Sequence, residues 1–166
     1  KIIKCDLDFF VFNFYRGFFV KNTEKGIKRM PISPTDDLTA MDWQVTPEAI
    51  EYVAKYYYER YRLPLIVAEN GVAISEWKTL DGSIPDYMRI DYMKRHIDAI
   101  KKIAEKYSVI GYFYWTLLDN FEWSLGYTRR FGLIYVDYKT QERTLKKSAY
   151  WYKKVIETNG ETDFEV

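Results

Sequence analysis

The sequence predicts an α/β fold in which parallel strands alternate with helices. Short apolar runs alternate with longer segments whose apolar residues recur at helical spacing, and this order is typical of β/α units. It occurs three times in 166 residues, with no low-complexity stretch and no Gly/Ser linker between the units. A long loop follows each strand. We therefore expect part of a (β/α)8 barrel, a fold in which functional sites lie on those loops.

The first unit combines an aromatic-rich strand with a helix. Residues 7–15 read LDFFVFNFY, a run typical of a strand buried on both faces, and a polar loop follows it. Thr46 is expected to cap the next helix, with Pro47 at the first helical position and Glu48 in the first turn. The helix is expected to reach about residue 61, because apolar residues recur at positions 50, 53, 54 and 57.

The other two units follow the same order. The expected strands are residues 63–68 and 109–115, the expected helices are about 87–106 and 147–158, and a short extended segment is expected at 132–138. Asn159 and Gly160 are expected to end the last helix, since both residue types tolerate the left-handed backbone found there.

Composition leaves carboxylates as the chemistry to consider. The chain has 25 Lys and Arg and 24 Asp and Glu, so its net charge of +1 gives no reason to expect nucleic acid or a membrane surface as a partner. Cys5 and His96 are the only residues of their kinds, which excludes disulfides within the chain and the common zinc sites. We expect His96 to be structural, and no metal or cofactor is predicted. The single cysteine and the lack of an Asn-x-Ser/Thr sequence favour a cytoplasmic protein.

The chain is unusually aromatic, at 19% Phe, Trp and Tyr. These side chains are expected either to fill a core or to bind a ligand that has an apolar face and a polar rim, as sugars do.

Polar or acidic residues stand where each apolar run ends. In a parallel sheet these strand ends meet at one edge, so Glu69 and Glu122 are expected to lie near each other. The alternation of side chains predicts that Leu65, Val67 and Glu69 share one face of their strand. The corresponding positions of the other strands are Val11, Asn13 and Tyr15, and Gly111, Phe113 and Trp115.

Several motifs resemble glycoside hydrolase family 1. Residues 66–71, IVAENG, resemble the nucleophile motif of that family, and residues 119–123, DNFEW, with 126–132, GYTRRFG, resemble its sugar-binding segment. The remaining matches are DFFVFNFY at 8–15, RIDY at 89–92, YVDY at 135–138 and WY at 151–152. The resemblance implies that residues 1–166 are the C-terminal part of one barrel, covering strands 6 to 8. The start at Lys1, without Met, is read as the start of a piece, with the N-terminal units absent from this sequence.

The resemblance also implies roles in a retaining β-glycosidase of the β-glucosidase type. Glu69 would be the nucleophile and Tyr15 would hold it by a hydrogen bond. Without the resemblance, Glu122 would be interpreted as an ordinary surface acid, and Arg129 and Arg130 as a pair of solvated loop residues. The residues implied to bind the β-glycoside are Asn13, Trp43, Trp115, Glu122, Trp123 and Phe131.

The sequence also departs from the family pattern. A retaining enzyme needs a second carboxyl group as acid/base, which the family carries in an Asn-Glu-Pro motif, and this chain has neither Asn-Glu nor Glu-Pro. The expected partners are therefore the missing N-terminal barrel units or a self-associating copy. The alternative is a catalytically silent partial barrel, a carbohydrate-binding or engineered fragment that needs a complementing part. Four positions differ from the usual residues: Val11, Phe14, Asp42 and Ala68.

Overall fold

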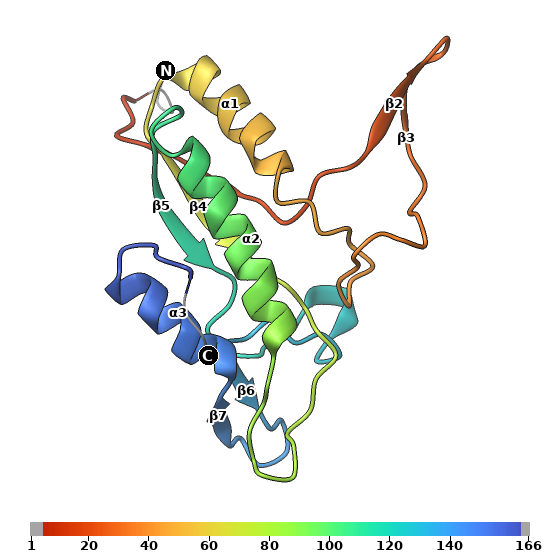
Figure 1. The fold of residues 1–166 in the computed structure, drawn as a ribbon, viewed down its shortest axis with the longest axis vertical. Coiled ribbons are helices and arrows are strands. Elements are labelled where there is room, and N and C mark those ends of the chain that lie inside the picture. Colours follow the sequence, from red (N-terminus) through yellow and green to blue (C-terminus); the bar gives the residue numbers. More distant parts are fainter. Residues whose placement is uncertain (1–4, 164–166) are drawn as a thin grey trace.

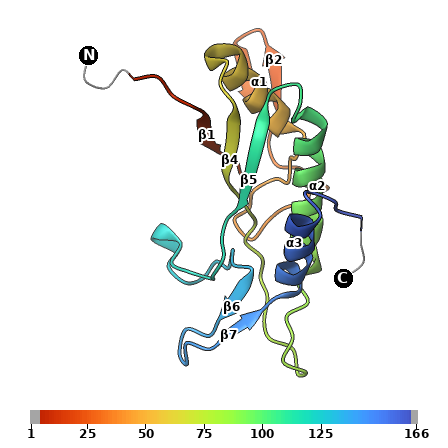
Figure 2. The same ribbon diagram turned by 90° about the vertical axis from the view of Figure 1, so that its left-hand side faces the viewer.

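A computed structural model describes residues 5–163, and a three-stranded parallel sheet forms its centre. The strands lie in the order β1 (Phe10–Asn13), β4 (Leu65–Asn70) and β5 (Val109–Tyr114), with β4 in the middle. Helices α1 (Ala49–Tyr61), α2 (Tyr87–Ile103) and α3 (Lys147–Glu157) follow the three strands and lie on one side of the sheet (Figures 1 and 2). The expected alternation of parallel strands and helices is present.

The core lies between the sheet and these helices. Leu65 and Val67 of β4 are fully buried against Ile50 and Ala54 of α1. A second cluster joins α2 to α3 and consists of Ile90, Met93, Ile97, Leu133, Trp151 and Val155. Burial of these aliphatic and aromatic side chains stabilises the position of each helix on the sheet.

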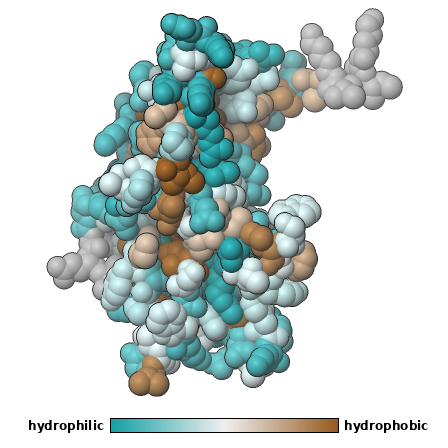
Figure 3. All heavy atoms as spheres, turned by 90° about the vertical axis from the view of Figure 1, so that its right-hand side faces the viewer, coloured by the Kyte–Doolittle hydropathy of each residue, from teal (hydrophilic) through white to brown (hydrophobic). Residues whose placement is uncertain are grey.

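The opposite face of the sheet carries exposed apolar side chains. Val11, Ile110 and Phe113 keep 43%, 62% and 61% of their surface exposed. Separately, hydrophobic residues form a strip through the middle of the side of the molecule that Figure 3 shows. Among the described residues, β1 and β5 each have a neighbouring strand on one side only. The exposed face of the sheet and its two edge strands therefore resemble the interior of an incomplete barrel.

A bulge in β4 corrects the predicted strand faces. Val67 is opposite Tyr112 on β5, whereas Asn70 is opposite Tyr114, so β4 holds one extra residue in this interval. Leu65 and Val67 consequently pack against the helices, while Glu69 turns toward Tyr15. The prediction that these three residues of β4 share one face was wrong because strict alternation does not continue through a bulge.

The two helix-end predictions had different outcomes. Thr46 does not cap α1 with its side chain; its hydroxyl accepts a 2.7 Å hydrogen bond from the amide of Gly17, and the helix begins at Ala49. The end of α3 is as expected, with Asn159 at φ 54° and the amide of Gly160 donating to Val155 O over 2.8 Å.

Two hairpins lie in segments that were expected to be loops or single extended segments. The first, β2 (Val20–Thr23) with β3 (Gly26–Arg29), extends away from the sheet in Figure 1. The second pairs β6 (Ile134–Val136) with β7 (Arg143–Leu145). The first strand is also shorter than expected. No helix among residues 5–163 is both long and apolar enough to cross a membrane.

Candidate active site

The candidate site lies where β1 and β4 end. The hydroxyl of Tyr15 donates a 2.7 Å hydrogen bond to Oε2 of Glu69. Asn13 is the register partner of Glu69 across the two strands, and its side chain is exposed. Burial, and then the bond to Glu69, raise the pKa of Tyr15. Tyr15 therefore stays protonated and acts as a donor to the carboxylate.

Two further aromatic rings surround Tyr15. Its ring centroid lies 5.5 Å from Trp43 and 6.2 Å from Phe131, both in edge-on contacts, and the last two rings are 6.4 Å apart. Asp42 has φ 55°, a left-handed conformation that glycine adopts most easily, just before Trp43. Glycine would therefore adopt this backbone shape with less strain than Asp42 does. The three rings form an aromatic wall beside Glu69.

Glu122 lies in the loop after β5, close enough to Glu69 for the charge of that carboxylate to act on it. Its amide donates to Gly126 O over 2.7 Å and its carbonyl accepts from Leu125 N over 2.8 Å, which fixes the tight turn that includes η1 (Trp123–Leu125). Burial, followed by the charge of Glu69, raises the pKa of Glu122. The expectation that Glu69 and Glu122 lie near each other agrees with this electrostatic coupling.

Trp115 and Trp123 differ in placement. Trp115 is half-buried and its amide donates to Asn70 O over 2.9 Å, so it lies beside the end of β4. Trp123 is 84% exposed. Neither ring packs on another aromatic ring among the described residues, in contrast to Trp43 and Phe131.

Gly71 is required by the close approach of these two segments. A Cβ atom at this position would lie 1.8 Å from Trp115 O. Only glycine leaves room for the backbone after β5 to pass the residues that follow Glu69.

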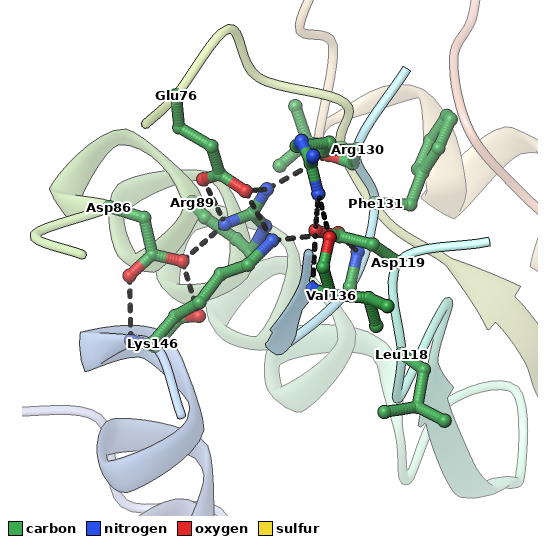
Figure 4. A network of polar contacts seen from close by, with 12 residues as sticks. Glu76, Asp86, Arg89, Leu118, Asp119, Arg130, Phe131, Val136 and Lys146 are labelled. Atoms are coloured by element: carbon green, nitrogen blue, oxygen red, sulfur yellow. Dashed lines mark hydrogen bonds and ion pairs between the residues drawn. The ribbon is translucent and has the colours of Figure 1, made fainter. Parts of the chain in front are cut away.

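A buried network of ion pairs lies next to this site and was not predicted (Figure 4). Arg89 pairs with Glu76 over 2.8 Å and with Asp86. Lys146 pairs with Asp119 over 2.8 Å and with Glu76. Arg130 completes the network through a 2.6 Å contact with Asp119. Three cations and three carboxylates thus balance each other, as burial of charge demands.

The network corrects the interpretation of Arg130 as one of a solvated pair of arginines. The side chain of Arg130 is only 17% exposed and lies 4.0 Å from the ring centroid of Tyr135, so it is not solvated. Arg129 instead donates to the carbonyl of Thr128 over 3.3 Å. Sequence spacing gave no sign of the network, because its members come from separate loops and helix ends.

The network also holds Phe131 from both sides. Arg89 donates to Arg130 O over 2.9 Å, and Gly132 N donates to Oδ1 of Asp119 over 2.9 Å. These bonds fix the peptides that flank Phe131, which in turn contacts Tyr15 and Trp43. The ion pairs and the aromatic wall are therefore one connected structure.

His96 is structural, as predicted. It is fully buried on α2, its Nδ1 lies 2.8 Å from Tyr92 O, and its ring stacks on Tyr92 at 4.0 Å. Burial lowers its pKa to about 4, so it is neutral at physiological pH. Within residues 5–163, no three His, Cys, Asp or Glu side chains gather in a way that could hold a metal ion.

Comparisons with known proteins identify the family that this chain resembles. The model of glycosyl hydrolase family 1 matches residues 1–161. Beta-glucosidase A of Thermotoga maritima is 43% identical over 97% of this chain and 37% of its own length, and beta-glucosidase A of Acetivibrio thermocellus is 36% identical over 96% and 37%. A bifunctional beta-D-glucosidase/beta-D-fucosidase of Bifidobacterium breve is 44% identical over 71% of this chain.

Solved structures give the same result. A family 1 β-glucosidase from Thermotoga maritima superposes with a TM-score of 0.85 at 41% identity, covering 94% of this chain and 36% of that one. The same enzyme has been solved in complex with deoxynojirimycin. The present chain spans little more than a third of the length of these relatives, which is consistent with part of a (β/α)8 barrel. The chain belongs to glycosyl hydrolase family 1.

Proposed function

We propose that this chain supplies the nucleophile and the sugar-binding side of a retaining β-glycosidase that acts on β-glucosides and related β-glycosides. The hydrogen bond from Tyr15 to Glu69 is the observation that carries the proposal. It holds one oxygen of a carboxylate at the end of a parallel strand, beside an aromatic wall and a second carboxylate at Glu122.

In the proposed reaction, Glu69 attacks the anomeric carbon of the sugar. The bond from this carbon to the leaving-group oxygen breaks as the ester to Glu69 forms, and a proton must reach that oxygen. Water then cleaves the ester and returns the carboxylate. Glu122, Trp115 and Trp123 bind the sugar together with Asn13, while Trp43 and Phe131 border the side where the leaving group departs.

The proton donor comes from outside this sequence. We propose that residues 1–166 form strands 6 to 8 of a (β/α)8 barrel, and that the remaining units supply the acid/base carboxyl group. The exposed face that includes Val11, Ile110 and Phe113 supports this, because those units would cover it. The same exposed face also suits the second candidate, a silent partial barrel that associates with another copy of itself.

Labelling with a 2-fluoro-β-glucoside tests the proposal in the full-length protein. We expect one covalent adduct that maps to Glu69 and is absent from the Glu69→Gln variant, because an amide cannot form the glycosyl ester. An adduct on a different carboxylate would overturn the assignment. The intact mass separates the two candidates: 20.0 kDa is the mass of this chain alone, and a complete barrel is much heavier.

A further inference from the structure

Asn70 ties together the three elements that meet behind Glu69. Its side chain is fully buried at the end of β4. Nδ2 donates to Phe14 O over 2.8 Å and to the hydroxyl of Tyr92 over 3.0 Å. Oδ1 accepts from the hydroxyl of Tyr112 over 2.9 Å. One amide therefore joins β4 to the segment after β1, to α2 and to β5.

Tyr92 extends this connection to Tyr15. Its hydroxyl accepts from Asn70 and donates to Tyr15 O over 3.1 Å, and its ring is held by the stacked ring of His96. Strand β1 ends at Asn13. The carbonyls of Phe14 and Tyr15 therefore lie outside the hydrogen-bond ladder of the sheet. Asn70 and Tyr92 supply the donors that these two carbonyls need.

A continuous series of bonds thus runs from Asn70 to the candidate nucleophile. Asn70 orients Tyr92, Tyr92 holds the backbone of Tyr15, and Tyr15 donates to Glu69. Asn70 also follows Glu69 directly in the chain, so rotation of its side chain would disturb both partners of the Tyr15–Glu69 bond. Neither Asn70 nor Tyr92 is exposed at the surface that would meet a sugar.

We propose that Asn70 and Tyr92 are positioning residues that fix Tyr15, and through its hydrogen bond Glu69, for attack on the anomeric carbon. This inference rests on the proposed function and adds two residues to it. Positioning acts on the transition state, in which the reacting atoms must align, and much less on the binding of the intact substrate. Loss of this series of hydrogen bonds from Asn70 to Glu69 should therefore lower kcat and leave KM nearly unchanged.

Tyr92→Phe in the full-length enzyme removes one hydroxyl and keeps the ring that stacks on His96. We expect kcat for p-nitrophenyl β-glucoside to fall about 10- to 100-fold, with KM changed less than about twofold. Tyr107→Phe is the matched control: Tyr107 is also buried, but its hydroxyl lies 3.5 Å from Glu51 of α1. It should retain full kcat.

A double variant separates positioning from loss of stability. If Tyr92 acts through Tyr15, Tyr15→Phe/Tyr92→Phe should be no slower than Tyr15→Phe alone. Losses that multiply would show that the two residues act independently and would overturn the proposal. Should Tyr92→Phe fail to fold, Tyr112→Phe removes the bond on the other side of the Asn70 amide and must show the same fall in kcat and the same non-additivity.

The outcome for the unmodified enzyme separates this inference from the proposed function. If 2-fluoro-glucoside labelling maps away from Glu69, the proposed function fails and the positioning role fails with it. If Glu69 is labelled while Tyr92→Phe and Tyr112→Phe keep full kcat, the positioning role alone is overturned.

Discussion

The hydroxyl of Tyr15 lies 2.7 Å from Oε2 of Glu69, although 54 residues separate them along the chain. Parallel pairing of β1 with β4 brings them together, and the bulge after Val67 turns Glu69 to the same side. The carboxylate thereby keeps a neutral donor whose pKa is raised by burial and by Glu69 itself.

Tyr15→Phe should slow the chemical step without loss of the fold. The ring keeps its contacts with Trp43 and Phe131, while the carboxylate loses the donor that orients it. We expect kcat on p-nitrophenyl β-glucoside to fall on the order of tenfold or more in the full-length enzyme. An unchanged kcat would show that the hydrogen bond has no part in the reaction.

The 166-residue chain alone should hydrolyse alkyl β-glucosides poorly or not at all. Substrates with poor leaving groups depend most on a proton donor, which this chain lacks under the proposed function. Addition of the N-terminal units should restore turnover. Full activity of the purified chain on such a substrate would contradict the proposal that the donor lies elsewhere.

Glu69→Gln should lower the pKa of Glu122. Burial raises that pKa first and the charge of Glu69 raises it second, so the variant removes only the second cause. The pKa should move toward 4.5 without reaching it, as measured by carboxyl 13C NMR titration.

The same shift has a consequence for stability. A carboxyl group with a raised folded pKa binds more protons in the native state, so its contribution to stability falls as pH rises from the unfolded toward the folded pKa. Glu122→Gln should remove this fall. An identical pH dependence in the variant and the unmodified protein would show that the pKa of Glu122 is not raised in the folded state.

Lys146→Met should destabilise the full-length protein strongly. Lys146 is fully buried between Glu76 and Asp119, and its removal leaves two buried carboxylates short of a partner. We expect a loss of about 3–5 kcal/mol in urea unfolding. Lys153→Met is the control, because the ion pair of Lys153 with Glu157 is exposed, at 3.6 Å. Its loss should lower the free energy of unfolding by no more than about 0.5 kcal/mol. Equal losses in both variants would contradict a structural role for the network.

The residues of the candidate site were more predictable from the sequence than the buried residues that hold them in place. Glu69 and Tyr15 lie in contiguous motifs at strand ends, so their types and positions carry the signal. The prediction that Glu69 shares a face with Leu65 and Val67 was wrong, because a pattern of apolar residues does not reveal a bulge. The cap at Thr46 failed for a similar reason: a hydroxyl beside a helix start bonds whichever amide is nearest, here that of Gly17.

The ion network and Asn70 were out of reach for a different reason. Lys146 and Glu76 are 70 residues apart, and each looks like an ordinary surface charge in its own segment. Only the folded chain shows that helix ends and loops bring them together in the interior. In the same way, Asn70 is unremarkable in sequence until the carbonyls beyond β1 are seen to need donors.

The last prediction concerns the substrate that the assembled enzyme prefers. Glu122 keeps a carboxylate in the proposed sugar site, and a phosphate on the sugar would add about −1.5 to −2 charges beside it. Arg130 cannot compensate, because it is committed to Asp119 over 2.6 Å and to Val136 O over 2.9 Å. Repulsion in a partly desolvated site should therefore favour unphosphorylated β-glucosides, β-galactosides or β-fucosides. We expect kcat/KM for p-nitrophenyl β-glucoside to exceed that for its 6-phosphate, and Glu122→Ser to reduce the difference while it weakens glucoside turnover. A higher kcat/KM for the phosphorylated substrate would show that Glu122 does not line the sugar site.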